Sequence, residues 1–171
     1  MNKEWEMNAR KEGYEYFDEP FDGSMKSNKY KHERYLNTAI WWFRKNKKRI
    51  LVYTDMIADV EYLYTVFAKD IEAIIYYKNI SENIDFSNVK KHYAKSKLQF
   101  IQIDYNPSKK VCFVTSRGKI IEYSTIVLAG NDTIIFDRKR LGLIKDEHGD
   151  RQVYRVKDRN AFKMIFEAFQ K

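Results

Sequence analysis

An aromatic side chain among cations is the residue pattern with the clearest chemistry in this sequence. Residues 39–43 are five apolar residues in succession, and a helix would spread them around its whole circumference. Leu36, Ile40 and Phe43 would share the buried stripe, whereas Trp41 would point about 140° away from Leu36. The cations predicted to surround Trp41 on this outer side are Arg34, Arg44 and Lys45.

The predicted surroundings of Trp41 allow three interpretations. Cations bind phosphates while a base stacks on an aromatic ring, at about 1–3 kcal/mol per base, so the site suits a single-stranded nucleic acid. Trp and Arg are also the residue types that most often dominate the binding energy of protein–protein interfaces. In the third interpretation Trp41 belongs to the core, covered by Phe17 or Phe21. The sequence leaves all three open.

Cations also gather in four short runs. If the runs share one face of the folded protein, they form a continuous surface for phosphates, and the affinity for nucleic acid would fall steeply with salt. If they are distributed around the surface, they contribute mainly to solubility. The runs are Lys45, Lys47, Lys48 and Arg49; Lys90, Lys91, Lys95 and Lys97; Lys109, Lys110, Arg117 and Lys119; and Arg138, Lys139 and Arg140.

Charge is divided unequally along the chain. The first 23 residues have a net charge of −4, whereas the whole chain has +8, which leaves +12 on the remainder. A body with this charge attracts polyanions, and an attached acidic segment can compete with them. We therefore expect residues 1–28 to be an acidic, flexible or partly docked arm and residues 29–171 to be a basic globular domain.

The arm also has the composition of a short binding segment. Aromatic rings can fill pockets while interleaved acids meet a basic rim. That rim would belong either to the same molecule or to a partner protein, and a solvated tail is the remaining alternative. Deleting residues 1–23 should raise the affinity for polyanions in the first case and abolish partner binding in the second. The aromatic residues concerned are Tyr14, Tyr16, Phe17 and Phe21.

Length and composition predict one soluble domain. The chain has 171 residues, of which 44% are hydrophobic and 16% aromatic, enough for an ordinary core. No apolar run approaches the roughly 18 residues that cross a bilayer, and no secretory signal is visible. We therefore expect no membrane contact, a cytoplasmic location and a buried thiol at Cys112. Frequent Lys, Asn, Ile and Tyr suggest an AT-rich coding sequence, as in a phage or mobile element.

Hydrophobic periodicity predicts an α/β fold, with α+β as the alternative. Early strands followed by helices favour parallel pairing and later strands joined by short turns favour hairpins, so we expect one mixed sheet. The predicted strands are 49–54, 71–77, 98–105, 110–116, 119–128, 133–137 and about 152–156, and the predicted helices include 31–45 and 87–97.

Three local features complete the predicted fold. Asp55 and Asp158 are predicted to be N-caps of two further helices, and Arg117 and Gly118 to form a two-residue hairpin turn. The apolar stripes of the two helices are Ile57, Val60, Leu63, Tyr64 and Phe67, and Phe162, Ile165, Phe166 and Phe169.

Motifs of catalytic sites are missing from the sequence. It contains no Gly-x-x-x-x-Gly-Lys-Ser/Thr loop, no Gly-x-Gly-x-x-Gly and no His-Glu-x-x-His, and its single Cys excludes a cysteine-rich zinc site. A metal-dependent nuclease needs carboxylates and a lysine that converge on a cation. These observations favour a binding protein without cofactor or metal over an enzyme. The candidates for a nuclease site are Asp132, Asp137 and Lys139, with Asp104 or Glu122.

The sequence thus predicts a small, non-enzymatic nucleic-acid-binding protein that uses a Lys/Arg surface and Trp41. The alternative is a protein-interaction module or inhibitor, in which Trp41 and the arm contact an acidic or nucleic-acid-associated protein. A metal-dependent nuclease is the third possibility. Phosphate binding should weaken steeply as salt rises, whereas an interface with a buried aromatic residue should persist, so salt dependence separates the first two.

Overall fold

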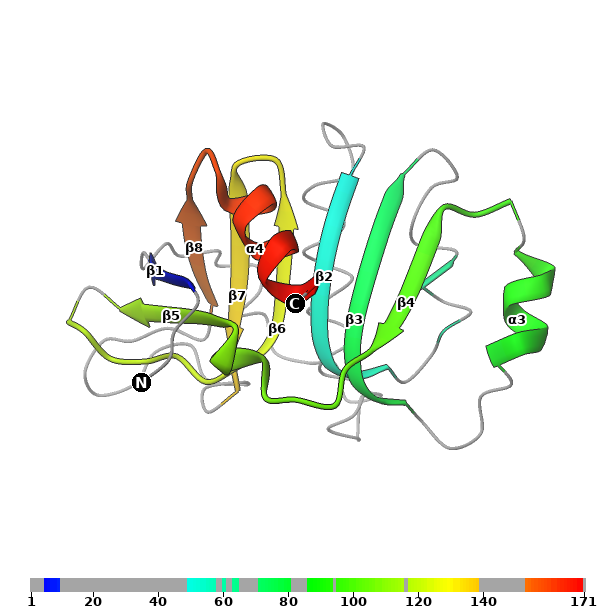
Figure 1. The fold of residues 1–171 in the computed structure, drawn as a ribbon, viewed down its shortest axis with the longest axis horizontal. Coiled ribbons are helices and arrows are strands. Elements are labelled where there is room, and N and C mark those ends of the chain that lie inside the picture. Colours follow the sequence, from blue (N-terminus) through cyan, green and yellow to red (C-terminus); the bar gives the residue numbers. More distant parts are fainter. Residues whose placement is uncertain are drawn as a thin grey trace, which may run out of the picture.

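The chain folds around one six-stranded sheet (Figure 1). The computed structural model describes residues 5–9, 49–57, 60, 63–64, 71–80, 86–93, 95–115, 117–138 and 153–170. Within these ranges the helices are α3 (Phe86–His92) and α4 (Ala161–Gln170), with a short 3-10 helix at Pro107–Lys109. The strands are β1 (Trp5–Ala9), β2 (Arg49–Ile57), β3 (Glu72–Ile80), β4 (Leu98–Gln102), β5 (Val111–Thr115), β6 (Tyr123–Ala129), β7 (Asp132–Asp137) and β8 (Val153–Lys157).

The sheet is mixed, as the sequence predicts. Its strand order is β4-β3-β2-β6-β7-β8, in which β2, β3 and β4 are parallel and β6, β7 and β8 are antiparallel to their neighbours. Parallel neighbours need a long crossover, whereas β6 and β7 are joined by Gly130 and Asn131 alone. Gly130 has a φ of +60°, which a residue without a Cβ adopts at little cost. The α/β fold is confirmed.

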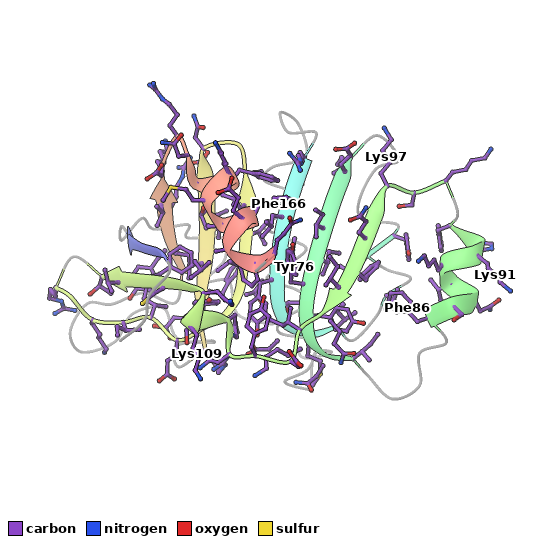
Figure 2. All side chains as sticks on the ribbon, viewed as in Figure 1. Tyr76, Phe86, Lys91, Lys97, Lys109 and Phe166 are labelled. Carbon is purple, nitrogen blue, oxygen red and sulfur yellow. The ribbon has the colours of Figure 1, made fainter. Side chains whose placement is uncertain are left out.

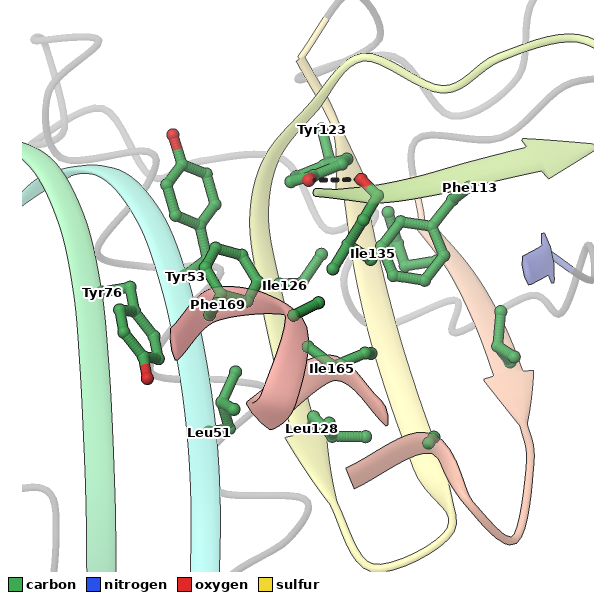
Figure 3. Packing of buried hydrophobic residues seen from close by; sticks show 14 of the residues in the cluster. Leu51, Tyr53, Tyr76, Phe113, Tyr123, Ile126, Leu128, Ile135, Ile165 and Phe169 are labelled. Carbon is green, nitrogen blue, oxygen red and sulfur yellow. Dashed lines mark hydrogen bonds between the residues drawn. The ribbon is translucent and has the colours of Figure 1, made fainter. Parts of the chain in front are cut away.

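The two faces of the sheet bury different side chains. On one face Ile165 and Phe169 of α4 pack with Leu51 and other strand residues (Figure 3). On the opposite face Val60 and Leu63 pack with alternate residues of the same strands, and α3 lies at the edge of this cluster. Each fully buried apolar side chain contributes about 1.5–3 kcal/mol. Because β2 and β3 contribute to both cores, their amino ends are held in fixed positions.

Asp55 is not a helix N-cap, so this prediction is wrong. β2 continues through Asp55 to Ile57, because its backbone stays paired with β3 as far as Ile57↔Ile80. The Asp55 carboxylate accepts hydrogen bonds from Tyr53 and Arg138 instead of capping a helix. Part of the predicted apolar stripe is nevertheless present: Val60, Leu63 and Tyr64 are helical and buried, whereas Ile57 belongs to β2 and Phe67 lies outside the described residues.

The hairpin predicted between 110–116 and 119–128 forms only beside its turn, where the Thr115 amide donates to the Lys119 carbonyl and the Ile121 amide to the Phe113 carbonyl; the predicted long antiparallel pairing is wrong. β5 pairs in parallel with β1 in a separate two-stranded sheet, in the register Trp5↔Val111 to Ala9↔Thr115. One bridge, Val114↔Ile120, joins the segments beside the turn, and β6 begins at Tyr123. The pairing partner of β5 comes from the distant N-terminus, so the local pattern could not reveal it. The part of the arm at residues 5–9 is therefore a strand.

The closing helix follows the prediction closely. The Asp158 carboxylate accepts a hydrogen bond from the Asn160 amide at 2.8 Å, immediately before α4. Ile165 and Phe169 are buried, while Phe162 and Phe166 pack at the margin of the core. α3, by contrast, is shorter than the predicted helix 87–97 because it ends at His92. Cys112 is buried, as predicted.

Candidate nucleic-acid interface

A groove of about 660 Å³ opens at the amino ends of the three parallel strands. It lies between α4 and the part of the sheet formed by β3 and β4, a face that no described helix or strand crosses in Figure 1. We call it the β3–β4 groove. The side chains that give the groove its charged, polar and apolar surface include Arg49, Glu72, Ile74, Lys97, Gln99 and Phe166.

Strand register places these side chains on the α4 side of the sheet. Side chains alternate between the two faces of a strand. Ile50, Ala73 and Leu98 point into the opposite core, so the residues that precede or follow them point toward α4. Arg49 is the register partner of Glu72, and Ile74 is the partner of Gln99. The groove therefore combines two cations, a carboxylate, an amide and apolar surface on one face.

Arg49 is held at the groove by two aromatic rings. Its guanidinium carbon lies 4.7 Å from the ring centre of Phe162 and 5.1 Å from that of Phe166. The two rings are stacked, with their centres 6.1 Å apart and an interplanar angle of 18°. Such cation–π contacts are worth about 0.5–1 kcal/mol at exposed sites. They orient the guanidinium while leaving its N–H groups able to donate to a ligand.

The groove has the parts needed to hold a phosphate and a flat ring together. Arg49 and Lys97 are exposed cations on either side of Glu72, and Phe166 is a half-buried ring beside them. Figure 2 shows Lys97 above the amino end of β4 and Phe166 on α4. Farther along β4, Ile101 is 39% exposed, which extends the apolar surface. Cations beside aromatic rings are the usual components of sites that bind single-stranded nucleic acid.

The described cations of the predicted basic runs do not share one face. Arg49 and Lys97 line the groove, and Lys95 is exposed in the connection that leads to β4. Lys90 and Lys91 lie in the last turn of α3, at the far edge of the sheet (Figure 2). The cations near β5 lie apart from the groove: Lys109, Lys110, Arg117 and Lys119.

Arg138 lies at the opposite end of the strands from the groove. It contacts Asp55, six residues after Arg49 on β2, which corresponds to about 20 Å of strand. Its Nη2 is 2.6 Å from Asp55 Oδ2 and also donates to the Tyr123 carbonyl at 3.0 Å. Arg138 is therefore part of an ion pair at the carboxyl end of β2 and is separate from the groove.

Two tyrosines complete the network around Asp55. The Tyr53 hydroxyl donates to Asp55 Oδ1 at 2.5 Å, and the Tyr123 hydroxyl donates to the Val111 carbonyl at 2.8 Å. Burial raises the pKa of Tyr53, and the hydrogen bond to Asp55 raises it further. Burial likewise raises the pKa of Tyr123. Both hydroxyls therefore stay protonated at neutral pH and act as structural donors.

Several predicted site residues lie outside the described residues, so their positions stay predictions. Phe162 and Phe166 were not predicted as site residues, because the apolar stripe of their helix places them in the core; the exposed Lys163 beside them on α4 was a signal. Glu72 and Gln99 were missed because only strand register brings them to Arg49. The predicted site residues outside the described ranges are Tyr14, Tyr16, Phe17, Phe21, Arg34, Trp41, Arg44, Lys45, Lys47, Lys48, Lys139 and Arg140.

The acids considered for a nuclease site do not converge in the described part of the chain. Asp132 and Asp137 lie at opposite ends of β7, and Asp132 forms an ion pair of 2.9 Å with Arg155. Among the described residues, no three His, Cys, Asp or Glu side chains lie where they could hold a metal ion together. In the same part of the chain, no helix is long and apolar enough to cross a membrane.

Comparisons with protein-family models, with curated proteins and with solved structures found no match to this chain.

Proposed function

We propose that the protein is a non-enzymatic nucleic-acid-binding protein and that the β3–β4 groove is its binding surface. The observation that carries the proposal is the position of Arg49, whose guanidinium is held against Phe162 and Phe166. Lys97 adds a second cation to the same groove. Phosphates would bind the two cations while a base stacks near Phe166, which is how proteins commonly hold single strands.

The charge of the chain supports this proposal over a neutral ligand. A net charge of +8 raises the local concentration of polyanions and speeds their association. The volume of the groove, about 660 Å³, falls within the range of about 300–1,000 Å³ typical of pockets for small organic groups. One or two nucleotides of a strand would therefore occupy it. A cytoplasmic location belongs to the proposal and is supported by Cys112, the only cysteine, being a buried thiol.

A protein-interaction module or inhibitor is the second candidate. Ile101 is 39% exposed beside the groove, and apolar side chains next to Arg and Phe suit a protein interface as well. In this case an acidic partner would take the place of the phosphates. Its binding should persist at salt concentrations that release a nucleic acid.

Fluorescence anisotropy with labelled single-stranded DNA, duplex DNA and RNA tests the proposal. Binding should be tightest for a single strand and should weaken steeply between low and physiological salt. Lys97→Ala should weaken binding to the single strand several-fold and reduce the slope of log affinity against log salt by about 0.7. Trp41→Ala, measured alongside, tests the predicted aromatic contact.

Lys109→Ala is the matched control for this experiment. Lys109 is exposed in the 3-10 helix near β5, so its loss changes the net charge equally but leaves the groove intact. It should change the affinity much less than Lys97→Ala does. Equal losses in the two variants, or no binding at low salt, would refute binding in the groove. Binding of a protein partner that survives high salt would favour the second candidate.

A further inference from the structure

A row of alternating charges crosses the amino ends of the three parallel strands. Arg49 is the register partner of Glu72, and Glu72 and Lys97 each directly precede the paired residues Ala73 and Leu98. Neighbouring strands are about 4.8 Å apart, so these side chains are within reach of one another. The order of charges along the row is positive, negative, positive.

The three charged side chains of the row, Arg49, Glu72 and Lys97, do not form ion pairs with one another. Ion pairs in the described part of the chain include Arg138–Asp55 and Arg155–Asp132, but none there joins Glu72 to Arg49 or Lys97. Arg49 lies over Phe162 and Phe166 instead. Glu72 is exposed within the groove, although a carboxylate there repels phosphates. A carboxylate at this position weakens the binding of a bare sugar–phosphate backbone, but it can accept hydrogen bonds from a ligand group that carries donors.

A ligand that matches the row must offer donors to a carboxylate and acceptors to a cation within one flat group. Guanine has this pattern, because its N1–H and N2–H2 are adjacent donors and its O6 and N7 are adjacent acceptors. On the corresponding edge of adenine, cytosine and thymine, an acceptor stands next to the donor and would repel a carboxylate. Guanine alone among the four bases can donate two hydrogen bonds to one carboxylate there.

We propose that the β3–β4 groove selects an unpaired guanine. Glu72 accepts from N1–H and N2–H2, and the base lies against the apolar surface at Phe166. The Lys97 ammonium has three donors, so it donates to O6 and also to a flanking phosphate. Arg49 remains available for a neighbouring phosphate, and Gln99 adds an amide at the floor of the groove. The guanine must be unpaired because N1–H and N2–H2 are engaged by cytosine in a duplex. This inference rests on the proposed function.

Base preference is measured with labelled ten-nucleotide dT strands that carry one central dG, dA or dC, bound at low salt to the full chain. The wild-type protein should bind the dG strand about 5-fold or more tightly than the others, the lower range for one well-made bidentate pair. Glu72→Gln should remove this preference and strengthen binding to plain dT, because a negative charge leaves the groove. Glu167→Gln, an equal charge change at an exposed position of α4, should keep the preference.

The outcomes separate this inference from the proposed function. If all strands bind equally and Lys97→Ala still weakens their binding, guanine selection is overturned while nucleic-acid binding in the groove stands. No binding of any strand would overturn both. A dG preference that persists in Glu72→Gln would also overturn the role of the carboxylate. Free GMP offers the same base with its own phosphate but without the flanking phosphates of a strand, so it should compete weakly. Competition equal to that of the dG strand would assign the groove to a free nucleotide instead.

Discussion

Phe169 and Phe166 lie three residues apart on α4, and we expect their substitution to have different effects. Loss of Phe169 should mainly lower the stability of the fold, whereas loss of Phe166 should mainly weaken ligand binding. Phe169 is only 4% exposed, and its ring stacks on Tyr76 at 4.8 Å and on Tyr53 at 6.1 Å (Figure 3). Its carbonyl also accepts a hydrogen bond from the Tyr105 hydroxyl at 3.2 Å. Phe169 thus fixes the end of α4 to β2 and β3. Phe166 is half-buried and lines the groove.

Phe169→Ala should lower the free energy of unfolding by about 3–5 kcal/mol. Truncating a buried phenylalanine removes its transfer free energy and leaves a cavity, which together cost about that amount. Loss of two aromatic pairs, each worth roughly 0.5–1.5 kcal/mol, places the value toward the upper end. Since domains of this size are stable by about 5–15 kcal/mol, the variant should lose a large fraction of its stability.

Urea unfolding followed by far-UV circular dichroism measures this loss. Phe166→Ala is the comparison: its ring is partly exposed, so unfolding should become easier by only about 1–2 kcal/mol, while affinity for a single strand should fall several-fold. A loss below about 1.5 kcal/mol for Phe169→Ala would refute the assignment of Phe169 as the anchor of α4. Unchanged affinity in Phe166→Ala would refute its place in the binding surface.

Two further predictions concern pH and backbone conformation. Because burial raises the pKa of Tyr53 and Tyr123 above the ordinary value of 10.0, stability should be intact below pH 10 and fall above it, by about 1.4 kcal/mol per pH unit for each tyrosine. Urea midpoints between pH 9 and 12 measure this fall, and Tyr53→Phe should make it shallower; a flat profile would contradict the prediction. Gly118→Ala should cost about 1 kcal/mol, measured by urea unfolding, because Gly118 has a φ of +81° and an added Cβ would meet nothing within 4 Å, so the cost is backbone strain alone. A neutral substitution would show that the turn relaxes.

The fold shows that deleting residues 1–23 is not a clean test of the acidic arm. Deleting residues 1–23 also removes β1, whose five residues pair with β5. If this deletion abolished function, the cause could be either the loss of β1 or the loss of the acidic charge. Replacing Asp18, Glu19 and Asp22 by Asn or Gln keeps β1 and tests the charge of the arm alone.

Local patterns in the sequence were enough to predict most of the sheet and its closing helix. Strand positions such as 49–54 and 133–137 follow from runs of buried apolar residues, and the stripe of α4 follows from the spacing of Ile165 and Phe169. The α/β class and the mixed sheet follow from how these segments are connected. These features are determined locally, because each depends on residues within a few positions of one another.

Features that depend on long-range pairing were decided only by the tertiary structure. The pairing of β1 with β5, and the continuation of β2 through Asp55, result from contacts between distant segments. The row of Arg49, Glu72 and Lys97 arises in the same way, because the register of three parallel strands aligns residues that are far apart in sequence. Register also places Arg138 at the other end of the strands, beside Asp55. The sequence could show which residues carry charge, but strand register determined which of those charges meet.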